Sequence, residues 1–206
     1  MNSIPTPTIS RLCALYQLLS QMNLQNHLSS KEIGQILGVP AHSIRKDISY
    51  LGVAGNSGAG YDVHKLRGLI ADSLGLNTVR RVCVVGLGRM GSAILNYPLG
   101  EEFKLVAGFD SSINRLETLK TSVELFPAYR ISEVVRSLSI DLAIITVPAE
   151  SAQEVADRLV EGGVKGIVNF APVPVKIKDK DVFVKQIDID GELRILSARI
   201  SVSTAL

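Results

Sequence analysis

Residues 82–91 read VCVVGLGRMG, in which an apolar run passes directly into the spacing GxGxxG. The run predicts a buried strand, and the pattern that follows predicts a helix over about 90–97. In that context Gly86 makes a tight turn, Gly88 lets the backbone approach a pyrophosphate, and Gly91 lets the helix pack closely on the strand. The stretch therefore predicts the opening strand of a dinucleotide-binding fold.

Downstream of this loop, apolar runs alternate with helical patterns. Strands are expected at 82–85, 104–109, 142–147, 166–168 and 182–184, and helices at about 90–97, 132–138 and 150–161. The stretch 111–131 gives no clear pattern. Such alternation predicts parallel strands joined by crossover helices, which is a Rossmann-like, doubly wound α/β sheet.

Asp110 follows the second expected strand, nineteen residues after Gly91. A carboxylate at this place accepts hydrogen bonds from the ribose hydroxyls of the adenosine and repels a 2′-phosphate, so NAD(H) is favoured over NADP(H). The nearest basic residue downstream, Arg115, is too far along the chain to indicate a phosphate pocket. The alternative is a glycine turn and a strand-end acid that bind no ligand.

Other contacts to a dinucleotide are expected where later strands end, at residues that suit an unreactive nicotinamide ring. No histidine lies in residues 79–206, so the proton donor or acceptor that a hydride-transferring enzyme often uses is missing. The candidate cofactor contacts are Gly86, Leu87, Gly88, Arg89, Met90, Gly91, Tyr97, Asp110, Thr146, Val147, Pro148, Asn169 and Phe170.

The N-terminal part has a different pattern, with three short helices. The first covers about 8–22, and the second follows a possible capping box at Ser29 and Glu32 and stops at Gly38. Pro40 opens the third, at about 41–51. The apolar face of the first helix contains Leu12, Leu15, Leu18, Leu19 and Met22, and the second helix carries Ile33, Ile36 and Leu37. The third is expected to bury Ile44, Ile48 and Leu51.

The second and third helices, joined by a tight turn, predict a helix-turn-helix, although such pairs also occur as plain packing units. A glycine-rich stretch at 52–60 then leads into Tyr61-Asp62-Val63, which predicts a hairpin, or wing. A further helix over 63–74 ends at Gly75, which gives a winged-helix domain at 1–77 and a nucleotide domain at 78–206. The candidate DNA contacts are His42, Ser43, Arg45, Lys46, Ser49, Tyr50, Gly58 and Gly60.

Composition is that of a folded protein, with 206 residues, 46% apolar and 20% charged. No apolar run is long enough to span a membrane and no signal peptide begins the chain, so a cytoplasmic location is expected. Cys13 and Cys83 form no metal-binding cluster and are expected in the core. The net charge of +2 lies entirely in residues 1–78, which alone is weak evidence for nucleic acid.

Taken together, these segments resemble the Rex family of redox-sensing transcriptional repressors over nearly the whole chain. The matching segments are LGVPAHSIRKDISYLG at 37–52, GAGYDV at 58–63, VVGLGRMGSAILNY at 84–97, VPAESAQEVADRLVEGGVKGIVNFAP at 147–172 and IDIDGELRIL at 187–196. The resemblance implies a homodimer with a swapped C-terminal helix. It also implies a repressor that binds a palindromic double-stranded operator and leaves it when NADH replaces NAD⁺.

The resemblance also assigns roles to single residues. It puts Arg45 and Lys46 on DNA, and it gives a switch to Tyr97, Asp188 and Arg11. The tyrosine and the aspartate would sense the nicotinamide region across the dimer, and the arginine would compete for the aspartate. From their own sequence context, Arg11 is an exposed helix charge and Asp188 is a helix N-cap.

Two departures from the family pattern are visible. The wing has Asn56-Ser57 where a basic pair is usual, which predicts weaker DNA binding or an altered operator. The C-terminal helix, with Gly191 inside it, is expected to be short and polar. Two other functions therefore stay open: a diverged paralogue that binds NAD(H) and acts through a protein partner, and a small NAD-dependent oxidoreductase.

Overall fold

The computed structural model describes residues 4–22, 27–52 and 60–204. The chain divides into two compact units, Met1–Thr78 and Val79–Leu206, which we call the N-terminal and the C-terminal unit. Each has its own hydrophobic core. Each is therefore described by itself.

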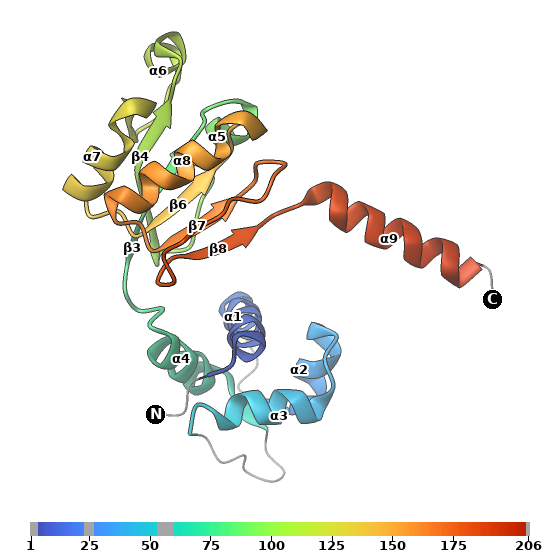
Figure 1. Ribbon diagram of the computed structural model, residues 1–206. Helices are drawn as coiled ribbons and strands as arrows, with labels where there is room; N and C mark the ends of the chain where they lie inside the picture. Colours follow the sequence, from blue (N-terminus) through green and yellow to red (C-terminus); the bar gives the residue numbers. More distant parts are fainter. Residues whose placement is uncertain (1–3, 23–26, 53–59, 205–206) are drawn as a thin grey trace. The chain divides into compact units, whose positions relative to one another are not determined.

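The N-terminal unit packs α1 (Thr6–Gln21), α2 (Ser30–Leu37), α3 (Ala41–Ser49) and α4 (Val63–Leu74) around a leucine- and isoleucine-rich core (Figure 1). The two-residue strands β1 (His27–Leu28) and β2 (Tyr61–Asp62) pair antiparallel. The fully packed core residues are Leu12, Leu15, Leu19, Leu28, Ile33, Ile44, Ile48, Val63, Leu66 and Ile70. The helix-turn-helix that the sequence predicts is α2 with α3.

Local hydrogen bonds fix where these helices begin and end. The predicted capping box is present, because the Glu32 N–H donates to the Ser29 hydroxyl at 3.2 Å and the Ser29 N–H donates to the Glu32 carboxylate at 2.7 Å. Gly38, with φ +64°, ends α2 in the left-handed region that favours glycine. Asp62 caps α4 by accepting from the Lys65 N–H at 2.8 Å.

Several local expectations for this unit are wrong. Cys13 lies on the outer face of α1, outside the core. Pro40 is the N-cap of α3 and does not form its first turn. Within the described residues the wing strand at Tyr61–Asp62 pairs with β1, which precedes α2, and the rest of the expected hairpin, at 53–59, lies outside them. Asn56, Ser57 and Gly58 lie outside the described residues.

The C-terminal unit is built on one sheet of parallel strands. The described strands are β3 (Arg80–Val85), β4 (Phe103–Asp110), β5 (Glu124–Pro127), β6 (Leu142–Ile145), β7 (Gly166–Asn169) and β8 (Phe183–Gln186). They are arranged in the order β5-β4-β3-β6-β7-β8, and every neighbouring pair is parallel. This is the strand order of a Rossmann fold, so the predicted fold class is confirmed.

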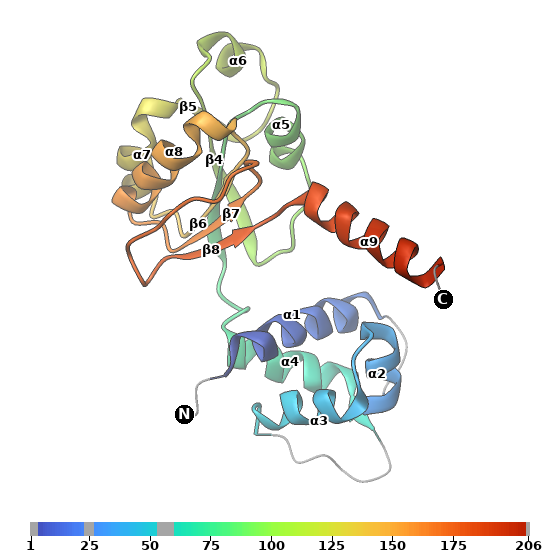
Figure 2. The same cartoon turned by 45° about the vertical axis from the view of Figure 1, so that its right-hand side comes forward.

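Helices cover both faces of this sheet (Figure 2). On one face α7 (Ile131–Ser137) and α8 (Ala149–Gly162) pack over alternate strand residues such as Val85 and Phe109. On the other, α5 (Arg89–Leu95) and α6 (Ile113–Thr118) cover the intervening residues, among them Val84. The stretch 111–131, which gave no pattern, contains α6, β5 and the 3₁₀ helix η1 (Ala128–Arg130).

A final helix, α9 (Ile189–Thr204), follows β8 and extends away from the sheet (Figures 1 and 2). It is not short, because it runs for 16 residues. It is also less polar than expected. The exposed large apolar side chains of this end of the chain are Phe183, Val184, Ile189, Leu193, Ile195, Leu196, Ile200 and Val202.

Candidate dinucleotide site and DNA-reading helix

The strand order of the sheet reverses between β3 and β6, and ligands of such folds bind at the carboxyl ends of the strands at this point. A cavity of about 810 Å³ lies there. Six of the predicted cofactor residues line it: Gly86, Gly88, Asp110, Thr146, Val147 and Pro148. The structure therefore gathers residues from strand ends and loops that are far apart in the sequence.

The glycine loop leaves room for a pyrophosphate. Gly86 has φ +92°, and a Cβ there would lie 2.7 Å from the Val147 side chain. A Cβ at Gly91 would collide with the Gly86 carbonyl oxygen, so helix and loop can pack this closely only with glycine. Around Gly88, in contrast, a Cβ would meet nothing within 4 Å, so its backbone faces open space. This arrangement fits a dinucleotide.

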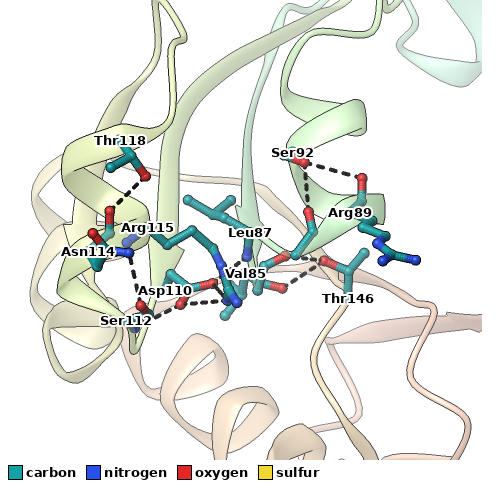
Figure 3. A network of polar contacts seen from close by, with 12 residues as sticks. Val85, Leu87, Arg89, Ser92, Asp110, Ser112, Asn114, Arg115, Thr118 and Thr146 are labelled. Carbon is teal, nitrogen blue, oxygen red and sulfur yellow. Dashed lines mark hydrogen bonds and ion pairs between the residues drawn. The ribbon is translucent and has the colours of Figure 1, made fainter.

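Thr146 holds the glycine turn from the neighbouring strand. Its hydroxyl lies 2.6 Å from the Gly86 carbonyl oxygen and 3.1 Å from the Val85 carbonyl oxygen (Figure 3). The hydroxyl proton is therefore used inside the protein. We assign Thr146 to positioning the loop, and not to donating a hydrogen bond to a ligand.

Asp110, at the end of β4, is 4% exposed and binds the glycine loop directly. Its carboxylate accepts the Leu87 N–H at 2.6 Å and the Ser112 N–H at 2.8 Å (Figure 3). Leu87 itself is a correction, because its side chain is buried in the core and its N–H is bonded to Asp110. Leu87 thus shapes the loop and presents neither its side chain nor its N–H to a ligand.

Arg115 lies on Asp110, contrary to expectation. Its Nη1 is 2.9 Å and 3.1 Å from the two carboxylate oxygens (Figure 3). The separation of Asp110 and Arg115 in the sequence suggested that they lie apart. They meet because α6 begins three residues after Asp110 and brings Arg115 back over the strand end. The cavity rim therefore carries a positive charge that the sequence reasoning missed.

Several other lining residues were also missed, half of them in the stretch without a clear pattern. They include two exposed apolar side chains, Ile113 and Tyr129, which are 66% and 76% exposed. The Pro127 at the end of β5 lies opposite Asp110 in the sheet. The sequence did contain a signal for the lining residues at the end of β5. The apolar pair in ELFP at 124–127 indicates a strand beside β4, and the ends of such strands border the ligand.

A second cavity, of about 380 Å³, lies near the start of α9. It is lined by two predicted residues, Met90 and Phe170, and by Asp188. Asn169 is a correction, because it is fully buried and its amide binds Val173 and Ala171 of the following loop and Gln186 of β8. Asp188 accepts the Gly191 N–H at 3.0 Å, as an N-cap of α9 does.

Three candidate residues of the C-terminal unit face solvent. Arg89 and Met90 open α5 and are exposed. Tyr97, which follows α5, is 64% exposed and lines neither of these two cavities. A contact between Tyr97 and a ligand or a second subunit is therefore sterically open.

In the N-terminal unit, α3 presents a basic outer face. His42, Arg45, Lys46 and Ser49 are exposed, whereas Ser43 and Tyr50 are half-buried. The Arg45 guanidinium donates to the Ser30 hydroxyl of α2 at 3.0 Å. Gly60 has φ +75°, and a Cβ there would lie 2.9 Å from the Leu28 carbonyl oxygen, so the close approach of β1 and β2 explains this glycine.

Behind α3, its one buried acid is tied to α1. Asp47 is 2% exposed, and its carboxylate accepts from Arg11 at 2.6 Å and 2.7 Å and from the Thr8 hydroxyl at 2.9 Å. This hydrogen bond raises the pKa of Arg11 above its ordinary value. Arg11 is therefore not a free exposed charge. The signal was present, since Asp47 falls on the apolar face that contains Ile44 and Ile48.

The cysteines and acidic residues in the described part of the chain form no further reactive or metal-binding site. Burial raises the pKa of the Cys83 thiol to about 12, so it stays protonated. In the described part of the chain, no group of three or more metal-ligating side chains comes together. None of the helices within residues 4–22, 27–52 and 60–204 combines the length and the apolar character that crossing a membrane requires.

Two protein families match separate parts of the chain. The family described as "Putative DNA-binding protein N-terminus" matches residues 3–49, which include α1, α2 and α3. The family described as "CoA binding domain" matches residues 77–173, which include the glycine loop and Asp110.

Relatives match nearly the whole chain. "Redox-sensing transcriptional repressor Rex" of Streptococcus pyogenes serotype M5 (strain Manfredo) is 38% identical over 202 residues, 95% of this chain and 94% of that protein. The solved structure of RSP with β-NAD⁺ and operator DNA is 31% identical with a TM-score of 0.87, covering 100% of this chain and 96% of that one. RSP with β-NADH is 28% identical with a TM-score of 0.85, covering 100% and 98%.

Proposed function

Because the chain belongs to the Rex family of redox-sensing transcriptional repressors, we propose that its two units, residues 1–78 and 79–206, have separate tasks. The N-terminal unit reads operator DNA and the C-terminal unit binds NAD(H). The observation that carries this proposal is the open glycine loop beside Asp110, in the same chain as a helix-turn-helix. The protein is a repressor and not an enzyme, as the names of its relatives support.

The larger cavity is the proposed place of the adenosine and the pyrophosphate. The backbone of Gly86 and Gly88 would face the phosphates, and Asp110 would orient the adenosine ribose. Ile113 and Tyr129 offer apolar surface for the adenine. Bound there, the dinucleotide supplies a ring whose charge differs between NAD⁺ and NADH, and the protein reads that difference.

The smaller cavity is the proposed place of the nicotinamide. Met90 and Phe170 give it apolar walls, and Asp188 stands at its edge where α9 begins. A positively charged ring and a neutral ring interact differently with a carboxylate at this position. The two ligand states would therefore favour different arrangements of α9.

The outer face of α3 is the proposed DNA-reading surface. Arg45 has the donor geometry for a guanine edge, and Lys46 suits a phosphate. His42 and Ser49 extend the same exposed face. The bond from Arg45 to Ser30 holds the guanidinium against the first turn of α2. The neighbouring Gly60 contributes backbone only.

A homodimer with exchanged α9 helices is the proposed assembly. Ile189, Leu193 and Leu196 recur at helical spacing and are 53–60% exposed in the isolated chain, which leaves an apolar stripe for a second subunit to cover. Two subunits would present two α3 helices to a palindromic operator. Since a repressor must share a compartment with its operator, we also propose a cytoplasmic location.

The switch proposal involves Tyr97, Asp188 and Arg11. Tyr97 and Asp188 are exposed, which allows contacts across a dimer. Arg11 is bound to Asp47, so it can compete for Asp188 only by loosening that pair. The NADH form would release DNA because NADH binds the non-binding arrangement more tightly than the DNA-binding one.

The test is operator binding in the presence of each nucleotide. The full chain is used to select AT-rich palindromic duplexes from a random pool with NAD⁺ present, and retention of the selected duplex is then measured by fluorescence anisotropy as NADH is added. The proposal expects loss of binding with NADH and retention with NAD⁺. Equal effects of the two nucleotides would contradict it.

A further inference from the structure

The charge at the adenosine end of the larger cavity differs from what Asp110 alone would give. Four charged residues line this cavity: Asp110, Arg115, Glu154 and Arg158. Arg115 contacts Asp110 at 2.9 Å and Arg158 contacts Glu154 at 2.6 Å. In the described lining, each carboxylate thus has its own arginine. The unpaired negative charge that usually excludes a 2′-phosphate is missing from these lining residues.

The Asp110 carboxylate is also committed to contacts inside the protein. Its two oxygens together accept the Leu87 N–H, the Ser112 N–H and the Arg115 guanidinium. These bonds orient the carboxylate toward the glycine loop and α6. They leave it less capacity for the ribose hydroxyls than a free carboxylate has.

Arg115, by contrast, has donors to spare. Within the described residues, Nη1 is the guanidinium nitrogen that is bonded to Asp110, and neither Nε nor Nη2 has a hydrogen bond. The side chain is 48% exposed, so its outer edge can be reached from the cavity. Ser111, which is exposed, also lines this cavity and adds a hydroxyl to its lining.

A guanidinium and a hydroxyl at the end of this strand are the groups that recognise a 2′-phosphate on an adenosine ribose. We propose that the site accepts 2′-phosphorylated dinucleotides, NADP(H), as well as NAD(H), and that Arg115 is the residue that admits them. Arg115 would keep Asp110 neutralised and bind the phosphate with its remaining donors. This inference rests on the proposed nucleotide site and names a second ligand for it.

The test is calorimetric titration of the full chain with NADH and with NADPH, at low and at physiological salt. For the wild type, we expect the dissociation constants of NADPH and NADH to lie within about tenfold of each other. The charge-assisted hydrogen bond from Arg115 to the 2′-phosphate offsets the loss of a comparable bond to the ribose hydroxyl. Arg115→Gln should weaken NADPH by about tenfold and NADH by less than about threefold. Arg115→Lys, which keeps the charge, should recover part of the NADPH affinity.

Lys104→Gln is the matched control, because it removes one exposed positive charge at the opposite end of β4. It should leave the ratio of the two affinities unchanged. NADH binding without NADPH binding in the wild type would overturn this inference and leave the proposed function intact. An equal loss of both ligands in Arg115→Gln would also overturn it. Failure of the wild type to bind either nucleotide would overturn the proposed function itself.

Discussion

At the scale of single residues, Gly88 is the sharpest test of the nucleotide loop. A Cβ there would project into the open side of the loop, where the pyrophosphate backbone contact is proposed. Gly88→Val should therefore abolish NADH binding in calorimetry while the circular dichroism spectrum stays that of the wild type. Gly68→Val, on α4 where a Cβ also meets nothing, is the matched control for β-branched insertion. Wild-type NADH affinity in Gly88→Val would contradict the proposed loop contact.

Substituting the two basic residues of α3 should weaken DNA binding in different ways. Arg45→Ala should cost about 1–3 kcal/mol on the selected duplex and relax the preference at one base pair, because a bidentate base contact is lost. Lys46→Ala should weaken all sequences alike and reduce the slope of log affinity against log salt by about one. Arg67→Ala, an exposed charge on α4, is the control. Identical profiles for both α3 variants would refute this division of roles.

Single-residue roles were also where sequence reasoning was weakest. The place of Asp110 at the cavity could be predicted from strand position and spacing, since both are visible in the chain. Its partner Arg115 was missed because the ion pair depends on how α6 turns back, and that turn has no strong sequence pattern. Asn169 and Leu87 were assigned to the ligand because they follow strands, yet their burial is set by neighbouring strands and loops.

At the scale of elements, the capping box of α2 is expected to tie stability to pH. Ser29→Ala should lower the melting temperature of the N-terminal unit by about 4–8 °C, since a lost N-cap serine costs about 1 kcal/mol. Hydrogen bonds from the Ser29 side chain and backbone lower the pKa of Glu32. A lowered carboxylate pKa gives stability that is present above the ordinary value and is lost as pH falls through the lowered one.

The check is thermal unfolding between pH 3 and 7, about the range over which a carboxylate titrates. Glu32→Gln should flatten the part of the pH profile that this carboxylate causes. Ser20→Ala, an exposed serine inside α1, is the control and should melt like the wild type. Equal pH profiles for Glu32→Gln and the wild type would show that the capping box contributes nothing measurable.

A second element, α9, should decide the assembly. Leu193→Glu combined with Leu196→Glu places charges on the apolar stripe and should convert a dimer to a monomer in sedimentation velocity experiments. The same variant should lose operator affinity, because two linked α3 helices are needed for a palindrome. Ser201→Glu, on the polar side with Asp190 and Arg194, is the control. A persistent dimer in the double variant would rule out α9 as the interface.

Elements were predicted best where local chemistry marks them. The range 63–74 for α4 matches the structure because Asp62 starts it and Gly75 ends it. Other boundaries differ by a few residues, as at β3 and α8. The pairing of β1 with β2 could not be predicted, since two residues at 27–28 give no periodicity and their partner is more than thirty residues away.

At the scale of the whole molecule, the order of the segments along the chain is enough to indicate the family. Few protein architectures combine a helix-turn-helix with a GxGxxG loop and a strand-end aspartate in this order. The exposure of the apolar side chains of α9 could not be predicted in the same way. The sequence shows which residues of the helix are apolar, but not whether the rest of the chain covers them.

The central claim is that the balance of NADH and NAD⁺ sets operator occupancy. The most direct measurement is operator affinity while the NADH to NAD⁺ ratio is varied at constant total nucleotide, for the wild type and for Gly88→Val. The dissociation constant of the wild type should rise by at least about fivefold from all NAD⁺ to all NADH, as an allosteric coupling of ordinary size requires, and Gly88→Val should show no dependence on the ratio. An operator affinity that is the same at both ends of the titration for the wild type would contradict the account.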